Sequence, residues 1–344
     1  MNVLVVLEGQ DDKATGPIFR DIADIVRDGL RNLGHPTRVV YCANLVTEAC
    51  FVSGERLIVL AAHNLANYVT LEGVLAVLER SLIPSDSILY NFEHIGCCLP
   101  QATPNEQPWL RDRSLVSRDA LEIYGSYTLW EYSEQNMQNL RAIGIRSELV
   151  PLGFSPKLWR SYSSRGIRRK GDRNKHEFID VLFVGAETPT RIAAIRRIRD
   201  TGVSVVHPNS AGIETFGAEL EAITMNSKIV LSLNAFESTT GECSTNPSCN
   251  NGEWKIARIV PLLANSRFVV AEMSGSASER EIFKGGVVFA PSERLAETCL
   301  YYLQRPQERK AIAERGRQII EQQPEADMLR TPVENAMRAR RQNT

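Results

Sequence analysis

Three groups of polar residues in the second half of the chain follow short apolar runs, and their residue types suit an anionic ligand. In the first group, Gly185 ends the run Phe183-Val184, and Arg191 comes shortly after. Between them, Thr188 can cap a helix and Pro189 suits its first turn. A helix start attracts phosphate oxygens, and a nearby guanidinium adds charge. The alternative is an ordinary capped helix with no ligand.

The second group is a single residue, Asn234, which follows the apolar run over residues 229–233. A side-chain amide at the end of a strand can recognise a nucleobase edge or a sugar hydroxyl. It can equally begin a turn, because Asn bonds its own backbone readily. Both interpretations stay open at this point.

The third group surrounds the start of a helix expected over residues 253–264. Gly252 allows close approach to the backbone, and Lys255 and Arg258 could neutralise a diphosphate. Glu253 could contact a ligand, or it could simply complement the helix dipole. The apolar stripe of this helix predicts which face is buried; it consists of Ile256, Ile259, Val260 and Leu263.

Short runs rich in Val, Ile and Leu alternate with helical segments and would position these groups. Strands are expected over 3–7, 37–42, 57–61, 87–91, 127–130 and 147–150, and again over 181–184, 203–206, 229–233, 268–270 and 287–289. Continuous apolar strands separated by helices predict parallel sheets covered on both faces. The fold class is therefore α/β, with two doubly wound Rossmann-like domains.

Composition places the domain boundaries. Residues 161–177 are almost devoid of apolar side chains and rich in Arg and Lys, which predicts a basic linker between domains at 1–160 and 178–323. The alternative for this segment is an electrostatic contact with an acidic acceptor or a membrane surface. The tail, 324–344, either packs back on the first domain or frays.

Bulk properties exclude several classes of protein. The 344 residues carry a formal net charge of −1, which argues against a protein that coats nucleic acid. The chain contains no phosphate-binding P-loop, and no dinucleotide fingerprint follows the first strand. Apolar runs fall short of the roughly 20 residues that span a bilayer. We therefore expect a soluble, cytoplasmic protein with reduced thiols, although Cys243 and Cys249 could form a small disulfide or half of a metal site.

The second half resembles the donor domain of glycosyltransferases with the GT-B fold, in particular the group-one, CgeB-like branch. The resemblance lies in Phe183-Val184-Gly185, Arg191, Asn234, Glu253 with Arg258, and Val269-Val270-Ala271-Glu272. Upstream, it continues in Leu89-Tyr90-Asn91-Phe92-Glu93-His94, Leu129-Trp130-Glu131-Tyr132-Ser133 with Asn136, and Val150-Pro151-Leu152-Gly153-Phe154. Where the wider group has a second glutamate, this chain has Pro261. Glu272 is the candidate that replaces it at the ribose.

The resemblance implies two domains facing a cleft and a metal-independent transfer from a nucleoside-diphosphate sugar, with a UDP-sugar as the expected donor and no other cofactor. An inverting reaction would need a base on the first domain. Glu93 is the first candidate because it lies just past a strand end, and His94 and His63 are the reserves. For each of them a hydrogen-bonded structural role is the alternative.

Two other functions remain open. A sugar-nucleotide epimerase of the same fold would act on the donor alone, and a non-catalytic module would bind the donor without chemistry. The missing second glutamate at Pro261 keeps the module among the alternatives. The acceptor could be a polysaccharide, a protein, a small molecule or a modified nucleic-acid base.

Overall fold

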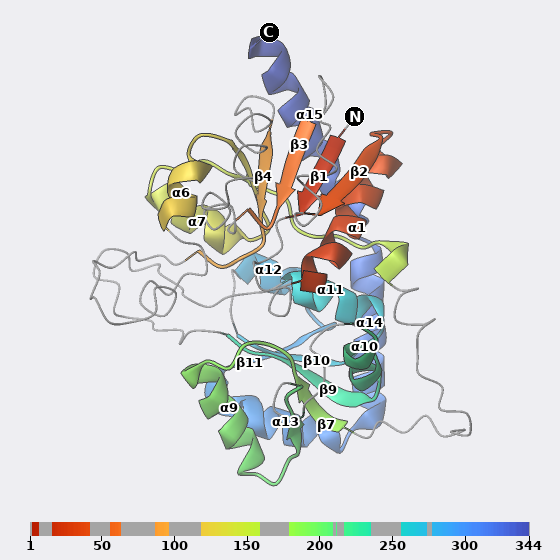
Figure 1. Cartoon of the computed structure of the whole chain (residues 1–344). Helices are drawn as coiled ribbons and strands as arrows, with labels where there is room; N and C mark the ends of the chain where they lie inside the picture. The colour runs from red at the N-terminus through yellow and green to blue at the C-terminus, as the bar shows by residue number, and fades with distance from the viewer. Residues whose placement is uncertain are drawn as a thin grey trace. The chain divides into compact units, whose positions relative to one another are not determined.

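The computed structural model describes residues 2–6, 16–41, 56–62, 87–95, 118–158, 179–208, 211, 217–234, 256–273 and 277–343 (Figure 1). The chain divides into two units. The described part of unit 1 comprises residues up to Gly153 together with the segment from Pro324 onward. That of unit 2 lies between Phe154 and Gln323.

Unit 1 is built on a sheet whose strands pair in the order β2-β1-β3-β4-β5-β6, all parallel. Helix α1 packs on β1 and β2, and α7 packs on β5 and β6. The elements are β1 (Asn2–Val6), α1 (Gly16–Asn32), β2 (Thr37–Tyr41), β3 (Arg56–Leu60), β4 (Ile88–Asn91), α6 (Arg118–Tyr124), β5 (Thr128–Glu131), α7 (Glu134–Ala142), β6 (Glu148–Leu149) and α15 (Glu325–Asn343).

Unit 2 repeats this architecture with the order β11-β10-β9-β7-β8, again all parallel. Counted from its first strand, the order matches that of the first five strands of unit 1, so both units follow one doubly wound plan. The elements are β7 (Ile179–Phe183), α9 (Pro189–Arg199), β8 (Val205–Val206), α10 (Gly217–Met225), β9 (Ser227–Ser232), α11 (Ile256–Ala264), β10 (Val269–Glu272), α12 (Ala277–Ile282), β11 (Val288–Ala290), the 3₁₀ turn η4 (Ser292–Arg294), α13 (Leu295–Leu303) and α14 (Pro306–Glu321).

The predicted fold class is confirmed: both units are α/β with parallel sheets. The expected strands lie within a few residues of the observed ones, and strands such as β3, β4 and β10 are buried along their whole length. Ser133 precedes α7 as expected, but its side chain makes no cap hydrogen bond. Thr188 does cap α9, since its hydroxyl accepts a hydrogen bond from the Arg191 N–H at 3.3 Å.

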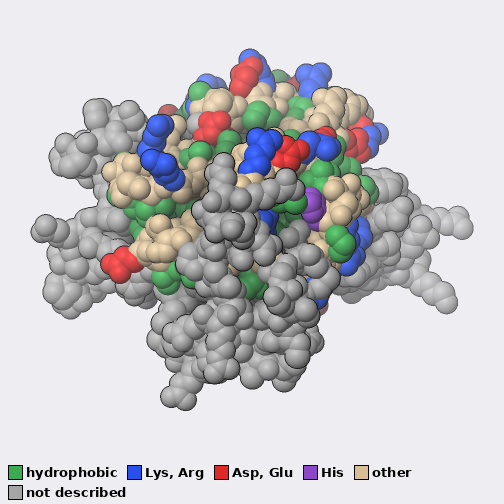
Figure 2. Space-filling view, turned by 90° about the horizontal axis from the view of Figure 1, so that it is seen from above, with side chains coloured by type: hydrophobic (Ala, Val, Ile, Leu, Met, Phe, Trp, Pro, Cys, Tyr) green, Lys and Arg blue, Asp and Glu red, His purple; other side chains and the backbone are tan. Residues whose placement is uncertain are grey.

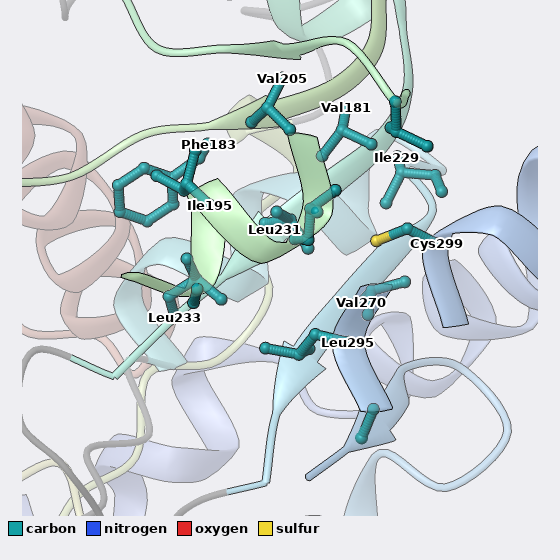
Figure 3. Packing of buried hydrophobic residues seen from close by; sticks show 14 of the residues in the cluster. Val181, Phe183, Ile195, Val205, Ile229, Leu231, Leu233, Val270, Leu295 and Cys299 are labelled. Carbon is teal, nitrogen blue, oxygen red and sulfur yellow. The ribbon is translucent and has the colours of Figure 1, made fainter. Parts of the chain in front are cut away.

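The core of unit 2 lies between the sheet and the pair α9 and α13. Alternate residues of β7 and β9 point into it, and Ile195 of α9 and Leu295 of α13 close it from the helical side (Figure 3). Cys299 is part of this core, where burial raises the pKa of its thiol to about 12. Helix α11 packs against β10 and α14.

Helix α15 packs along α1 of unit 1. The contact requires a glycine, because a methyl group on Gly29 would lie 2.6 Å from Glu325 Cγ and 2.8 Å from Leu329 Cδ1. Glu325 is 2% exposed, and its Oε2 accepts a hydrogen bond from the Gly153 N–H at 2.5 Å. The buried side chain of Glu325 therefore links the start of α15 to Gly153, where the first segment of unit 1 ends.

The outer surface mixes both signs of charge. Figure 2 shows basic and acidic side chains interspersed over the described part of one face. On α15, ion pairs one turn apart join Arg330 to Asp327 at 3.0 Å and Arg338 to Glu334 at 3.4 Å. This surface agrees with the near-zero net charge.

Glu325 makes the stability of unit 1 depend on pH. Burial raises the pKa of its carboxyl group to about 8, against 4.5 in an exposed glutamate. The folded chain therefore holds the proton more tightly than the unfolded chain. The stabilisation is complete below pH 4.5 and is lost as the pH rises through about 8.

We predict that the free energy of unfolding of unit 1 falls across this pH window, by up to about 1.4 kcal/mol per pH unit for each such group. Glu325→Gln should make the dependence less steep, because an amide does not titrate; scanning calorimetry at several pH values measures it. The exposed Glu122→Gln in the same unit is the control. Equal slopes for the two variants would contradict the assignment.

Candidate functional site

The strand order of unit 2 reverses between β7 and β9, and the predicted residues gather at this point. Gly185 follows β7 and Asn234 follows β9, and these two strands are neighbours in the sheet. In doubly wound sheets, ligands bind beyond the carboxyl ends of the strands where the order reverses. The candidate site of unit 2 therefore lies at this edge.

Arg191 joins the ends of these two strands. Its Nε and Nη2 donate to the Leu233 carbonyl at 3.2 and 3.0 Å, and its Nη1 donates to the Ala186 carbonyl at 3.2 Å. The residue is 4% exposed, and its guanidinium lies 5.6 Å from the centre of the Phe183 ring. The sequence predicts that Arg191 supplies a cation to a phosphate, and that role stays a prediction. Its hydrogen bonds to Leu233 and Ala186 fix the backbone of the site.

Gly185 brings two cations close to one point of the backbone. A methyl group placed on this residue would lie 3.3 Å from Arg258 Nη1 and 3.5 Å from Arg191 Nη1. A larger side chain would therefore push against both guanidinium groups. Arg258, on α11, is only partly buried. The guanidinium groups of Arg191 and Arg258 give this edge of the sheet positive charge, which suits an anionic ligand.

His207 holds the same loop, and the sequence analysis did not select it. Its Nε2 lies 2.8 Å from the Gly185 carbonyl oxygen, and its Nδ1 lies 3.3 Å from Glu187 Oε1. The imidazole stacks on Phe183 with ring centres 5.6 Å apart and is 3% exposed. A lone histidine after a two-residue strand gives no pattern signal, so only the fold reveals this contact.

Asn234 and Glu272 meet at the next strand ends. The backbone N–H of Asn234 donates to Glu272 Oε2 at 2.9 Å, and the two residues are 2% and 5% exposed. Within the described ranges, the buried Asn234 Nδ2 has no hydrogen-bond acceptor. A buried donor without an acceptor costs about 1–3 kcal/mol, which a ligand oxygen could recover.

Four predicted site residues lie outside the described residues: His63, Gly252, Glu253 and Lys255. The structure therefore brings together Gly185, Arg191, Asn234, Arg258 and Glu272 in unit 2. In unit 1 it places Glu93 and His94 directly after β4, where Glu93 is partly exposed and His94 is 1% exposed. Cys243 and Cys249 also fall outside the described part.

Glu131, at the end of β5, is the centre of a polar network in unit 1. It is fully buried, and its oxygens accept from Asn91 Nδ2 at 2.8 Å, Asn136 Nδ2 at 2.9 Å and the Tyr132 N–H at 2.9 Å. Burial raises the pKa of its carboxyl group to about 8, and these bonds oppose the shift. Sequence similarity marked Glu131 and Asn136, but not their joint role.

Metal-ligating side chains do not cluster within the described ranges, where no group of three or more His, Cys, Asp or Glu residues could hold an ion. Among the same residues, no helix has both the length and the apolar character to cross a membrane.

Comparison with solved structures relates the whole chain to glycosyltransferases. A sucrose-phosphate synthase from Thermosynechococcus elongatus is 11% identical with a TM-score of 0.58, over 98% of this chain and 99% of that one. Anabaena HepE in complex with UDP-glucose is 12% identical with a TM-score of 0.57, over 98% and 99%. An alpha-glucosyltransferase in complex with UDP and a mismatched DNA is 9% identical with a TM-score of 0.58, over 98% and 100%.

These similarities confirm the predicted GT-B fold over nearly the full chain. No family model matches the sequence, and no curated protein matches it either. The CgeB-like branch and the individual site residues therefore remain predictions from the sequence.

We predict that Arg191→Lys destabilises unit 2 in the absence of any nucleotide. An ammonium cannot reproduce the geometry in which three guanidinium nitrogens bond two carbonyls. The loss should be about 2 kcal/mol, measured by calorimetry or denaturant unfolding. Arg196→Lys, on the exposed face of the same helix, is the control. If both variants unfold alike, the carbonyl bonds of Arg191 contribute little.

Proposed function

We propose that this chain is a glycosyltransferase that moves a sugar from a UDP-sugar to a hydroxyl acceptor. The observation that carries the proposal is the edge between β7 and β9, where Arg258 approaches Gly185 and the buried Asn234 amide has no acceptor in the described part of the chain. Structures of the same fold support the choice of donor, since HepE is in complex with UDP-glucose and the alpha-glucosyltransferase with UDP.

The diphosphate would lie beside Gly185, where the missing side chain lets an oxygen approach the backbone. Arg258 would neutralise the charge that grows on the leaving UDP as the glycosidic bond breaks. Arg191 would contribute a positive field from its buried position while it holds the two strand ends. This division of roles follows from their burial, since Arg258 is more exposed than Arg191.

Asn234 would present its Nδ2 to an oxygen of the base or the sugar. Glu272 holds the backbone of Asn234 in place through its bond to the Asn234 N–H. We predicted Glu272 at the ribose; we now propose that it also acts as the support for Asn234.

On unit 1, Glu93 is proposed as the base that deprotonates the acceptor hydroxyl. It lies at the carboxyl edge of the sheet and is partly exposed, so its side chain is accessible to an acceptor. His94 is buried, which makes it a poorer candidate for direct contact with a large acceptor. His63 remains a reserve by its place in the sequence.

The binding-module alternative rests on Pro261. This residue lies inside α11, where its ring provides no polar group for a ribose. Incubation with UDP-glucose separates the three functions. Release of glucose supports a transferase, an isomerised sugar nucleotide supports an epimerase, and binding without chemistry supports a module.

We predict that Arg258→Ala weakens the binding of UDP by about 10-fold to 100-fold, because one charged hydrogen bond contributes about 1.5–3 kcal/mol. Isothermal titration calorimetry measures the affinity, and an unchanged melting temperature shows that the fold is intact. Arg196→Ala, a surface arginine of the same unit, is the control. Equal affinities for the two variants would remove Arg258 from the site.

For Glu93→Gln we expect turnover of UDP-glucose to fall by about 10²–10⁴-fold, since the amide cannot accept a proton. The affinity for UDP should stay at the wild-type value. Glu122→Gln, on the neighbouring helix α6, controls for the loss of a surface charge. Normal turnover in Glu93→Gln would show that this residue is not the base.

A further inference from the structure

Residues 93–95 of unit 1 form neither strand nor helix, yet side chains hold their backbone at both ends. Asn91 Oδ1 accepts from the Glu93 N–H at 3.2 Å, and Asn136 Oδ1 accepts from the Ile95 N–H at 3.0 Å. The amides of Asn91 and Asn136 both donate to the Glu93 carbonyl, at 2.7 and 2.8 Å. Asn139 Nδ2 donates to the Ile95 carbonyl at 2.7 Å.

Glu131 connects this arrangement to the sheet. Its two oxygens accept from the same Asn91 and Asn136 amide groups that bond the Glu93 carbonyl. Each amide nitrogen therefore donates one hydrogen to Glu131 and one to Glu93, which fixes both amides in a single orientation. Tyr124 adds a bond from its hydroxyl to Asn91 Oδ1 at 3.2 Å.

Burying such a polar network in the core has a cost in folding free energy. A buried carboxyl group loses its hydration, and an apolar side chain of similar volume would fill the space without that cost. The bonds hold only a short segment that adds no secondary structure. That segment carries Glu93, and it leaves this side chain partly exposed at the carboxyl edge of the sheet.

We propose that Glu131 is a positioning residue, which sets the place of Glu93 through Asn91 and Asn136. The proposal rests on the proposed transferase function only for its effect on turnover. Its structural part, that Glu131 orders residues 93–95, stands on the hydrogen bonds alone. Glu131 itself is fully buried and would touch neither donor nor acceptor.

Glu131→Gln tests both parts. A glutamine presents an N–H₂ group in place of one oxygen, so at least one donor from Asn91, Asn136 or Tyr132 faces another donor. Glu325→Gln is a matched control in the same unit: Glu325 is also a buried glutamate, but it lies at the start of α15 and accepts a hydrogen bond from the Gly153 N–H.

Hydrogen exchange followed by mass spectrometry is measured on peptides that contain residues 93–95. We expect faster exchange in Glu131→Gln than in the wild type or in Glu325→Gln, because the Glu93 and Ile95 N–H bonds lose their support. Equal exchange in the three proteins would overturn the proposal, whatever the activity.

Hydrolysis of UDP-glucose gives the second readout. We expect kcat to fall on the order of 10-fold to 100-fold in Glu131→Gln, with KM for UDP-glucose unchanged because the proposed donor site lies in unit 2. A loss of the same size in Glu325→Gln would overturn a specific positioning role, since it would follow from destabilisation alone.

The two readouts separate the two claims. A wild-type protein that never hydrolyses UDP-glucose would count against the proposed function, while the exchange experiment would still decide whether Glu131 orders the segment. Should Glu131→Gln fail to fold, Asn136→Ala takes its place, because it deletes the amide that joins Glu131 to the Glu93 carbonyl and to the Ile95 N–H. Unchanged exchange near Ile95 in that variant would contradict the network.

Discussion

The hydrogen bonds from Arg191 to the carbonyls of Leu233 and Ala186 hold the carboxyl edge of the second sheet together. A parallel sheet leaves such carbonyls without partners where its strands end, and a buried carbonyl needs a donor. One planar cation provides several donors at once. The positions of Gly185 and Asn234 then follow from this connection, and so does the place where Arg258 approaches the backbone.

Unit 1 orders the ends of its strands with an acceptor in place of a donor. Its first five strands follow the same order, and at the ends of β4 and β5 the buried carboxyl group of Glu131 accepts from the amides of Asn91 and Asn136. The amides then bond the backbone of residues 93–95. In both units, buried polar side chains thus order short irregular segments at the edge where doubly wound sheets bind ligands.

The sequence predicted the strands well because buried strands such as β3 and β10 read as continuous apolar runs. It predicted less about α15, since Pro324 and Pro332 are typical helix breakers. Pro324 in fact precedes the helix, and the helix continues through Pro332. Gly29 lies inside α1, and the sequence alone did not indicate that α15 packs closely against it.

The candidate site was predictable as a set of positions but not as a set of roles. Gly185, Asn234 and Glu272 follow strand ends, which is visible in the sequence. Whether an arginine bonds a phosphate or a carbonyl depends on which backbone lies beside it, and residue spacing does not contain that information. Arg191 illustrates this limit, because its partner Leu233 is distant in the chain.

The central claim is that a nucleoside diphosphate binds where the strand order of unit 2 reverses. A crystal structure of the protein with UDP tests this most directly. We predict phosphate oxygens within hydrogen-bonding distance of Arg258 and the backbone of Gly185, with a ligand oxygen accepting from Asn234 Nδ2. UDP bound at another place, or absent at saturating concentration, would contradict the account.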